Sequence, residues 1–115
     1  MNYRKFENQY VIRLDRGEEI VESLKTIAEK ENIKLAYLTG IGAVGKVTAG
    51  VFDTKEKVFK GKTLEGDLEV VSIGGNINTM NGETYVHFHI SVADEQGSVF
   101  GGHLQEAVIL SLIHI

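Results

Sequence analysis

The chain has 115 residues, a length typical of one domain that buries roughly two thirds of its unfolded surface. It contains no cysteine, which excludes disulfides and thiolate metal sites, and no apolar run of about 18 residues that would cross a membrane. Its formal net charge is −4, so we do not expect this domain alone to bind nucleic-acid phosphates. The N-terminal residues lack an apolar signal region. We therefore expect a single cytoplasmic domain over residues 1–115 with no membrane partner.

The N-terminal part of the sequence predicts a strand followed by an amphipathic helix. Residues 9–14 alternate in the manner of a strand. Residues 15–18 read Asp-Arg-Gly-Glu, the spacing of a capping box, which predicts that Asp15 caps the helix. Asn32 is predicted to end the helix in the left-handed conformation. The apolar stripe that should pack on a sheet consists of Ile20, Val21, Leu24, Ile27 and Ala28.

A glycine-bearing stretch follows, over residues 39–45, after a short apolar strand at 35–38. It matches neither the dinucleotide-binding pattern nor the phosphate-binding loop, so we interpret its glycines as allowing a bend or close backbone approach in a curved sheet. A strand is expected at 46–52, a turn at 53–56 and a returning strand at 57–63.

The next segment predicts a central strand and a tight hairpin. Residues 64–67 are expected to break the pattern before a strand at 68–73, which continues through residues 74–78 with a bulge at the glycine pair. Asn81-Gly82 is the preferred dipeptide of a type I′ hairpin.

Two strands complete the chain, over residues 84–93 and 98–103, with a turn at 94–97 between them. One helix followed by about six strands predicts an α+β fold. We expect a curved, mostly antiparallel sheet, sandwich-like or a small open barrel, with the helix packed against it.

The strand at 84–93 has two chemically different faces, because side chains alternate with period two. One face is apolar throughout: Val86, Phe88, Ile90 and Val92. The other carries Tyr85, His87, His89 and Ser91. The two histidines therefore share a face outside the core.

Three histidines predict a metal site. His87 and His89 have Cα atoms roughly 6.6 Å apart, so both rings reach one ion. His103 on the neighbouring strand supplies a third ligand, and Gly101-Gly102 leave its approach uncrowded. Three imidazoles favour zinc, or iron, nickel or cobalt, over magnesium or calcium, with water in a fourth position. The alternative is that all three are ordinary surface or turn histidines.

Catalysis at such an ion also needs a general base near the bound water. Glu69, Asp94 and Glu106 are candidates by chemical type only, because the sequence does not place them near the histidines. No nucleophile motif accompanies them.

Five motifs of this chain occur together in a known family: Gly42-Ala43-Val44, residues 64–72, Gly75-Asn76-Ile77, Val86-His87-Phe88-His89 and Val99 to Leu104. With them the chain resembles the plants-and-prokaryotes conserved domain, the PPC domain, from about Tyr10 to Val108. The resemblance implies a sandwich-like α/β domain that assembles as a homotrimer. It also implies that a segment binds partners: Gly66, Asp67, Leu68, Glu69, Val70 and Val71.

The chain departs from the family in two places. Plant members carry an AT-hook that contacts DNA, whereas this sequence has no Arg-Gly-Arg-Pro core and no proline. Family members also continue through a further strand, so we expect the C-terminal strand to be truncated and residues 110–115 to be non-native; His114 receives no functional weight. The local excess of lysine at Lys55, Lys57, Lys60 and Lys62 is interpreted as a solvated hairpin edge.

Our leading hypothesis is a homotrimeric PPC-type protein that binds zinc, or another divalent transition metal, and acts as a small-ligand-binding or regulatory module. A metal-dependent, hydrolytic enzyme is the first alternative. A DNA-associated regulatory protein is the second.

Overall fold

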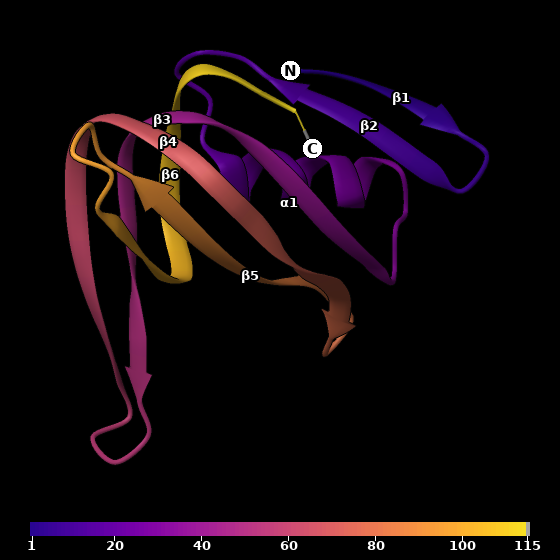
Figure 1. Cartoon of the computed structure of the whole chain (residues 1–115). Helices are drawn as coiled ribbons and strands as arrows, with labels where there is room; N and C mark the ends of the chain where they lie inside the picture. Colours follow the sequence, from indigo (N-terminus) through magenta and orange to yellow (C-terminus); the bar gives the residue numbers. More distant parts are fainter. Residues whose placement is uncertain (115) are drawn as a thin grey trace.

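A computed structural model describes the backbone of residues 1–114 and the side chains of residues 1–110. The expectations about residue 115 and about the side chains of the tail, including His114, lie outside the described part. The elements are β1 (Asn2–Phe6), β2 (Gln9–Leu14), α1 (Ile20–Lys30), β3 (Ala36–Asp53), β4 (Val58–Met80), β5 (Glu83–Ala93) and β6 (Val99–His114), shown in Figure 1.

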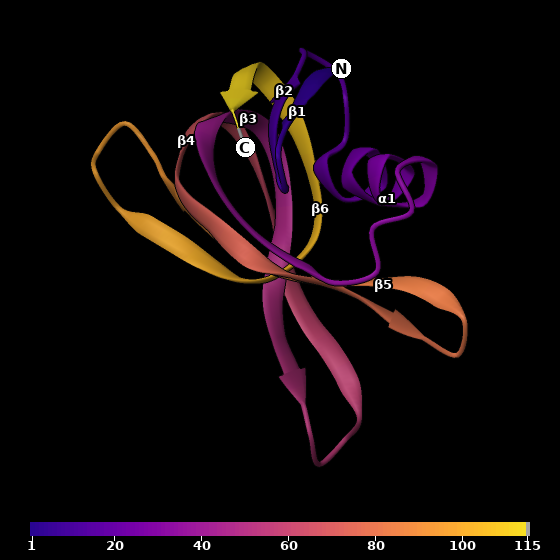
Figure 2. The same ribbon diagram turned by 90° about the vertical axis from the view of Figure 1, so that its right-hand side faces the viewer.

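All six strands belong to one antiparallel sheet in the order β1-β2-β6-β3-β4-β5. β5 also pairs with β6, so β3, β4, β5 and β6 form a closed ring. The hairpin of β1 and β2 extends this ring through the end of β6. α1 lies beside the ring, and the β3–β4 hairpin projects away from the rest (Figure 2). The predicted α+β class, a curved antiparallel sheet with one helix, is confirmed.

The start of α1 differs from the prediction. Glu19, not Asp15, is the N-cap: its carboxylate accepts hydrogen bonds from the backbone N–H groups of Val21 and Glu22, at 3.0 and 2.8 Å. Only the return bond of the predicted capping box forms, from the Asp15 N–H to Glu18 Oε1 at 2.7 Å. Asp15 is therefore not the cap.

A ladder to β6 explains why the helix begins late. The Gly17 N–H donates to the carbonyl of Ile109, and the Ile109 N–H donates to the carbonyl of Glu18, both at 2.9 Å. These bonds, with the bridge between Glu19 and Val108, hold the segment before the helix against β6. At the other end the prediction is confirmed: Asn32 has φ +56°, and the Ile33 N–H closes on the carbonyl of Ala28 at 2.8 Å.

β3 and β4 are longer than predicted, because each continues through its glycine-rich segment. The glycines at 39–45 were predicted to allow a bend in a curved sheet, and they lie inside β3, where the pairing with β4 shifts register between Gly40 and Gly42 and between Val44 and Lys46. The expected break at 64–67 is wrong, because these residues lie inside β4. Strands tolerate such glycines where the sheet curves strongly.

The predicted bulge at residues 74–78 is also wrong. Pairing is regular there, and the shift lies between Val70 and Ser72 in the ladder with β5. This displacement reverses which side chains of β4 face the core. Leu68 and Val70 are buried before it, whereas Ile73 and Ile77 are buried after it.

The predicted turns are confirmed. Asp53 Oδ1 accepts from the backbone N–H groups of Lys55 and Glu56, both at 2.9 Å. Asn81 and Gly82 have φ +54° and +79°, as a type I′ turn requires. Asp94 Oδ1 fixes the last turn by accepting from Gln96 and Ser98. The hairpin strand β1 was not predicted; its polar sequence, Asn-Tyr-Arg-Lys-Phe, gives no clear alternation.

The core forms where α1 packs against the inner face of the ring. Phe88, Ile90 and Val92 are at most 3% exposed, so the apolar face of the histidine strand is confirmed. Among the described residues, no helix has the length and apolar character needed to span a membrane. The fully buried large side chains are Phe88, Leu14, Ile20, Leu24, Ile27, Ile73, Ile109, Val44, Val47 and Val92.

Candidate metal centre

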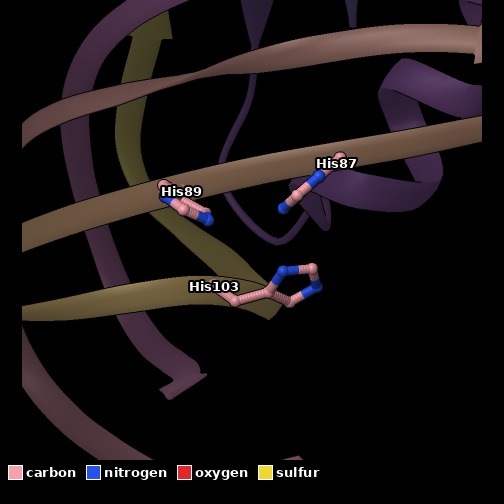
Figure 3. A group of neighbouring side chains, drawn as sticks. All are labelled: His87, His89 and His103. Carbon is pink, nitrogen blue, oxygen red and sulfur yellow. The ribbon is translucent and has the colours of Figure 1, made fainter. Parts of the chain in front are cut away.

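The three predicted histidines lie together on the outer surface of the ring. His87 and His89 project from the outer face of β5, and His103 projects from β6. In the ladder His89 and His103 are direct partners. Figure 3 shows the three rings directed toward one common space. His87 and His89 are exposed, and His103 is half-buried.

The geometry fits a single transition-metal ion. One nitrogen of each ring lies within 4.8 Å of the corresponding nitrogens of the other two. A tetrahedral ion with bonds of about 2.0–2.1 Å holds its ligand nitrogens roughly 3.4 Å apart. Small ring rotations therefore suffice to form the site. The ring centroids of His87 and His103 are 4.9 Å apart, and those of His87 and His89 are 5.1 Å apart.

The electrostatics keep one of these ligands in the form that binds metal. Burial, together with the neighbouring imidazoles of His87 and His89, lowers the pKa of His103 below its usual value. Neutral imidazole is the form that coordinates a metal ion. The rings of Phe59 and His103 meet edge-on, with centroids 5.9 Å apart.

The carboxylates considered as general bases have other partners or lie elsewhere. Glu106 lies 3.5 Å from the Lys46 ammonium, and Asp94 accepts the hydrogen bonds of the last turn. Glu69 pairs with Ala93 at the far end of the β4–β5 ladder from His87. Among the side chains that the structure describes, no carboxylate joins the three histidines in a metal-binding group.

The structure adds neighbours that the sequence did not reveal. An open hollow of about 480 Å³ lies beside the histidines, lined by Ser72, Gly74 and Asn76 of β4 and by His87, His89 and Ser91 of β5. In the ladder Ser72 pairs with Ser91, Gly74 with His89 and Asn76 with His87. These β4 residues face outward because of the register shift just before Ser72. The sequence gives no local sign of that shift.

The predicted partner-binding segment, Gly66 to Val71, lies in β4 directly before the hollow. Leu68 and Val70 are 5% and 4% exposed and belong to the core. Its outward-facing side chains are Asp67, Glu69 and Val71. Its role in partner binding stays a prediction.

Comparison with curated proteins finds relatives much longer than this chain. Two proteins named bifunctional protein GlmU, from Synechococcus sp. strains JA-3-3Ab and JA-2-3B'a(2-13), are 28% and 26% identical to it over 102 residues. The aligned region covers 88% of this chain and 15% of each relative. The chain thus spans a small part of the curated relatives that it matches.

Several solved structures share the whole fold. A proposed DNA-binding protein from Bacteroides thetaiotaomicron is 32% identical, with a TM-score of 0.94 over 98% of this chain and 79% of that one. A plant- and prokaryote-conserved protein from Pyrococcus horikoshii is 37% identical, with a TM-score of 0.86 over 91% and 74%. A metal-containing protein from Archaeoglobus fulgidus is 29% identical, with a TM-score of 0.84 over 99% and 82%.

The family comparison agrees with these structures. The sequence model of the Plants and Prokaryotes Conserved domain, abbreviated PCC or PPC, matches residues 1–115. The resemblance inferred from the five motifs is thereby confirmed, and the chain belongs to the Plants and Prokaryotes Conserved domain family.

Proposed function

We propose that this protein binds a divalent transition metal ion, zinc first, through His87, His89 and His103. The observation that supports this most directly is the convergence of three imidazole nitrogens within 4.8 Å of one another on two adjacent strands. The metal-containing relative from Archaeoglobus fulgidus, which shares the fold at 29% identity, adds support. The bound ion serves a small-ligand-binding or regulatory module, in which the open coordination position takes up the ligand.

Metal analysis of the purified protein tests this proposal. We expect about one ion per chain after incubation with zinc and removal of excess, and loss of most of it in His89→Ala. Tyr85→Phe is the matched control, because Tyr85 lies on the same face of β5 but outside the histidine group. Equal metal content in wild type and His89→Ala would refute the assignment.

A hydrolytic metalloenzyme is the second candidate, favoured by the fourth coordination position that three protein ligands leave for water. A binding role has more support, because the described carboxylates lie outside the histidine group and none of them lines the hollow beside it. Hydrolysis of a generic ester by the zinc-loaded protein, lost in His89→Ala, would favour the enzyme.

We also propose that the protein forms the homotrimer that the family resemblance implies. We propose the cytoplasm as its location, because a chain without cysteine has no disulfides that would need an oxidising compartment. Exposed apolar side chains support an interface between copies. Val51, Phe52 and Val58 at the tip of the β3–β4 hairpin are 46–68% exposed, and Val99 and Phe100 of β6 are 58% and 42% exposed. Sedimentation equilibrium should give three times the 12.7 kDa chain mass.

Association with DNA is favoured by the name of the relative from Bacteroides thetaiotaomicron. The charge opposes it: the net charge is −4, and Lys60 is paired with Asp53 and Glu56, each at 3.0 Å. We expect no salt-dependent binding of duplex DNA at physiological ionic strength by this domain. Such binding would support the DNA-associated function instead.

A further inference from the structure

The hollow beside the histidines has a definite chemical character. Its polar groups are the hydroxyls of Ser72 and Ser91 and the amide of Asn76, all on the outer face of the β4–β5 ladder. No lysine, arginine, aspartate or glutamate lines it among the residues that the structure describes. In that part of the chain the side chains of Ser72, Asn76 and Ser91 form no hydrogen bond with other protein groups. Their donors and acceptors are therefore free for a ligand.

Gly74 leaves the centre of the hollow open. It pairs with His89 in the ladder, so a side chain at residue 74 would stand beside that imidazole. Nothing in the backbone requires glycine here: a Cβ at residue 74 would have only an ordinary contact of 3.6 Å with the carbonyl of Leu38. The open space next to His89 is thus a property of the missing side chain.

The charge balance selects the ligand class. A divalent ion on three neutral imidazoles keeps its full charge, and no described carboxylate in the group offsets it. An anionic oxygen donor is therefore preferred over a neutral one. Phosphate groups are usually also held by arginine or lysine, which the hollow does not offer. Hydroxyl and amide groups suit the hydroxyl or carbonyl oxygens of a small organic acid.

We propose that the site binds a small hydroxycarboxylate or oxocarboxylate, with its carboxylate toward the ion and its remaining polar atoms along Ser72 and Asn76. This inference rests on the proposed metal-binding function. The 480 Å³ hollow accommodates a molecule of this size beside His89.

Cobalt-loaded protein tests the inference, because the visible spectrum of cobalt reports on its coordination sphere. Glycolate and pyruvate are the probes, with inorganic phosphate and acetate as comparators. We expect saturable spectral changes with glycolate or pyruvate at concentrations at least tenfold lower than with phosphate or acetate. Gly74→Val should keep the cobalt spectrum but weaken glycolate binding at least tenfold, and the double variant Ser72→Ala, Asn76→Ala should weaken it about fivefold or more.

These experiments distinguish a wrong ligand class from the absence of a metal site. If glycolate and pyruvate do not change the cobalt spectrum, or if phosphate binds as tightly as they do, the proposed ligand class is wrong while metal binding stands. The same holds if Gly74→Val binds glycolate with wild-type affinity. Absence of any protein-bound cobalt spectrum would refute the metal site itself. Tyr85→Phe, outside the hollow, should behave as wild type.

Discussion

Gly75 lies directly against the backbone carbonyl of His87 on the neighbouring strand. A Cβ at residue 75 would collide with that carbonyl oxygen, and Gly75 has φ +150°, which side chains rarely adopt. The backbone that presents His87 is thus in contact with a residue that cannot carry a side chain.

Gly75→Ala should therefore destabilise the protein by about 2 kcal/mol or more, since both the collision and the φ value oppose the methyl group. Urea unfolding of the metal-free protein measures this change. Gly74→Ala is the matched control, because its methyl group would have only an ordinary contact; we expect a change within about 0.5 kcal/mol. Equal effects of the two substitutions would contradict the close approach.

Phe88 anchors the inner face of the strand that carries His87 and His89. It is 1% exposed, and its replacement by alanine leaves a large cavity. We expect a loss of about 3–5 kcal/mol in unfolding free energy for Phe88→Ala, and a smaller loss for Phe88→Leu. A loss below about 1 kcal/mol for alanine would show that the side chain is not in the core.

Glu19 stabilises two elements at once. Its carboxylate caps α1 and also accepts the Ala107 N–H of β6 at 2.9 Å. Glu19→Ala should cost about 2–4 kcal/mol, because the cap is lost and the Ala107 N–H loses its partner.

Asp15→Ala tests the helix cap that the sequence predicted. The Asp15 side chain contacts only exposed charged groups, so its loss should cost well under 1 kcal/mol. A larger effect of Asp15→Ala than of Glu19→Ala would restore Asp15 as the cap. Chemical denaturation of both variants measures the difference.

The metal-free protein should lose stability as the pH falls below about 6.5. Burial and the adjacent His87 and His89 lower the pKa of His103 in the folded state. In the unfolded chain His103 has the ordinary pKa of about 6.5, so as the pH falls it is protonated there before it is protonated in the folded chain. Acid therefore favours unfolding, until the pH passes the lowered pKa of His103, and the full stability is present above about 6.5.

Urea midpoints at about pH 7.5 and 5.5 measure this dependence. His103→Gln, which does not titrate, should show a smaller fall between the two. The backbone N–H of Glu56, the Lys60 ammonium and the backbone N–H of Lys55 lower the pKa of Asp53, so this carboxyl does not titrate within this window. A fall of the same size in His103→Gln would assign the pH dependence to other groups.

Metal binding should stabilise the folded protein, because the three histidines lie close together in the folded chain but not in the unfolded chain. An ion present at about 100 times its dissociation constant would add about 2.7 kcal/mol. Thermal unfolding with zinc, and again after EDTA, measures the gain and its reversal. The variant with all three histidines replaced by alanine should show no gain; an equal gain would locate the ion elsewhere.

Local alternation was enough to predict the two faces of the histidine strand. Val86, Phe88, Ile90 and Val92 fall on one side, so the placement of His87 and His89 followed from period two alone. The turns at Asn81 and Asp94 were equally local. His103 could be assigned to the same site because the turn between β5 and β6 is short.

Other features depend on contacts between distant residues and left no local pattern. Glu19 becomes the cap because residues 17 and 18 pair with Ile109, some 90 positions away. The glycines of β3 and β4 resemble chain breaks in the sequence, but the closed ring uses them within continuous strands. The outward direction of Ser72 and Asn76 depends on a register shift that only the pairing of β4 with β5 defines.

His103 is also the residue of β6 at which pairing with β5 ends and pairing with β3 begins. Its backbone pairs with His89 of β5 and, on the other side, with Gly50 of β3, so it is the final rung of one ladder and the first of the next. The β5–β6 ladder that closes the ring has only five rungs, from His89–His103 to Ala93–Val99. An ion bound by His89 and His103 would therefore crosslink β5 and β6 where this short ladder closes the ring. Protonation of His103 would stop it from binding the ion and would thereby remove this link between β5 and β6.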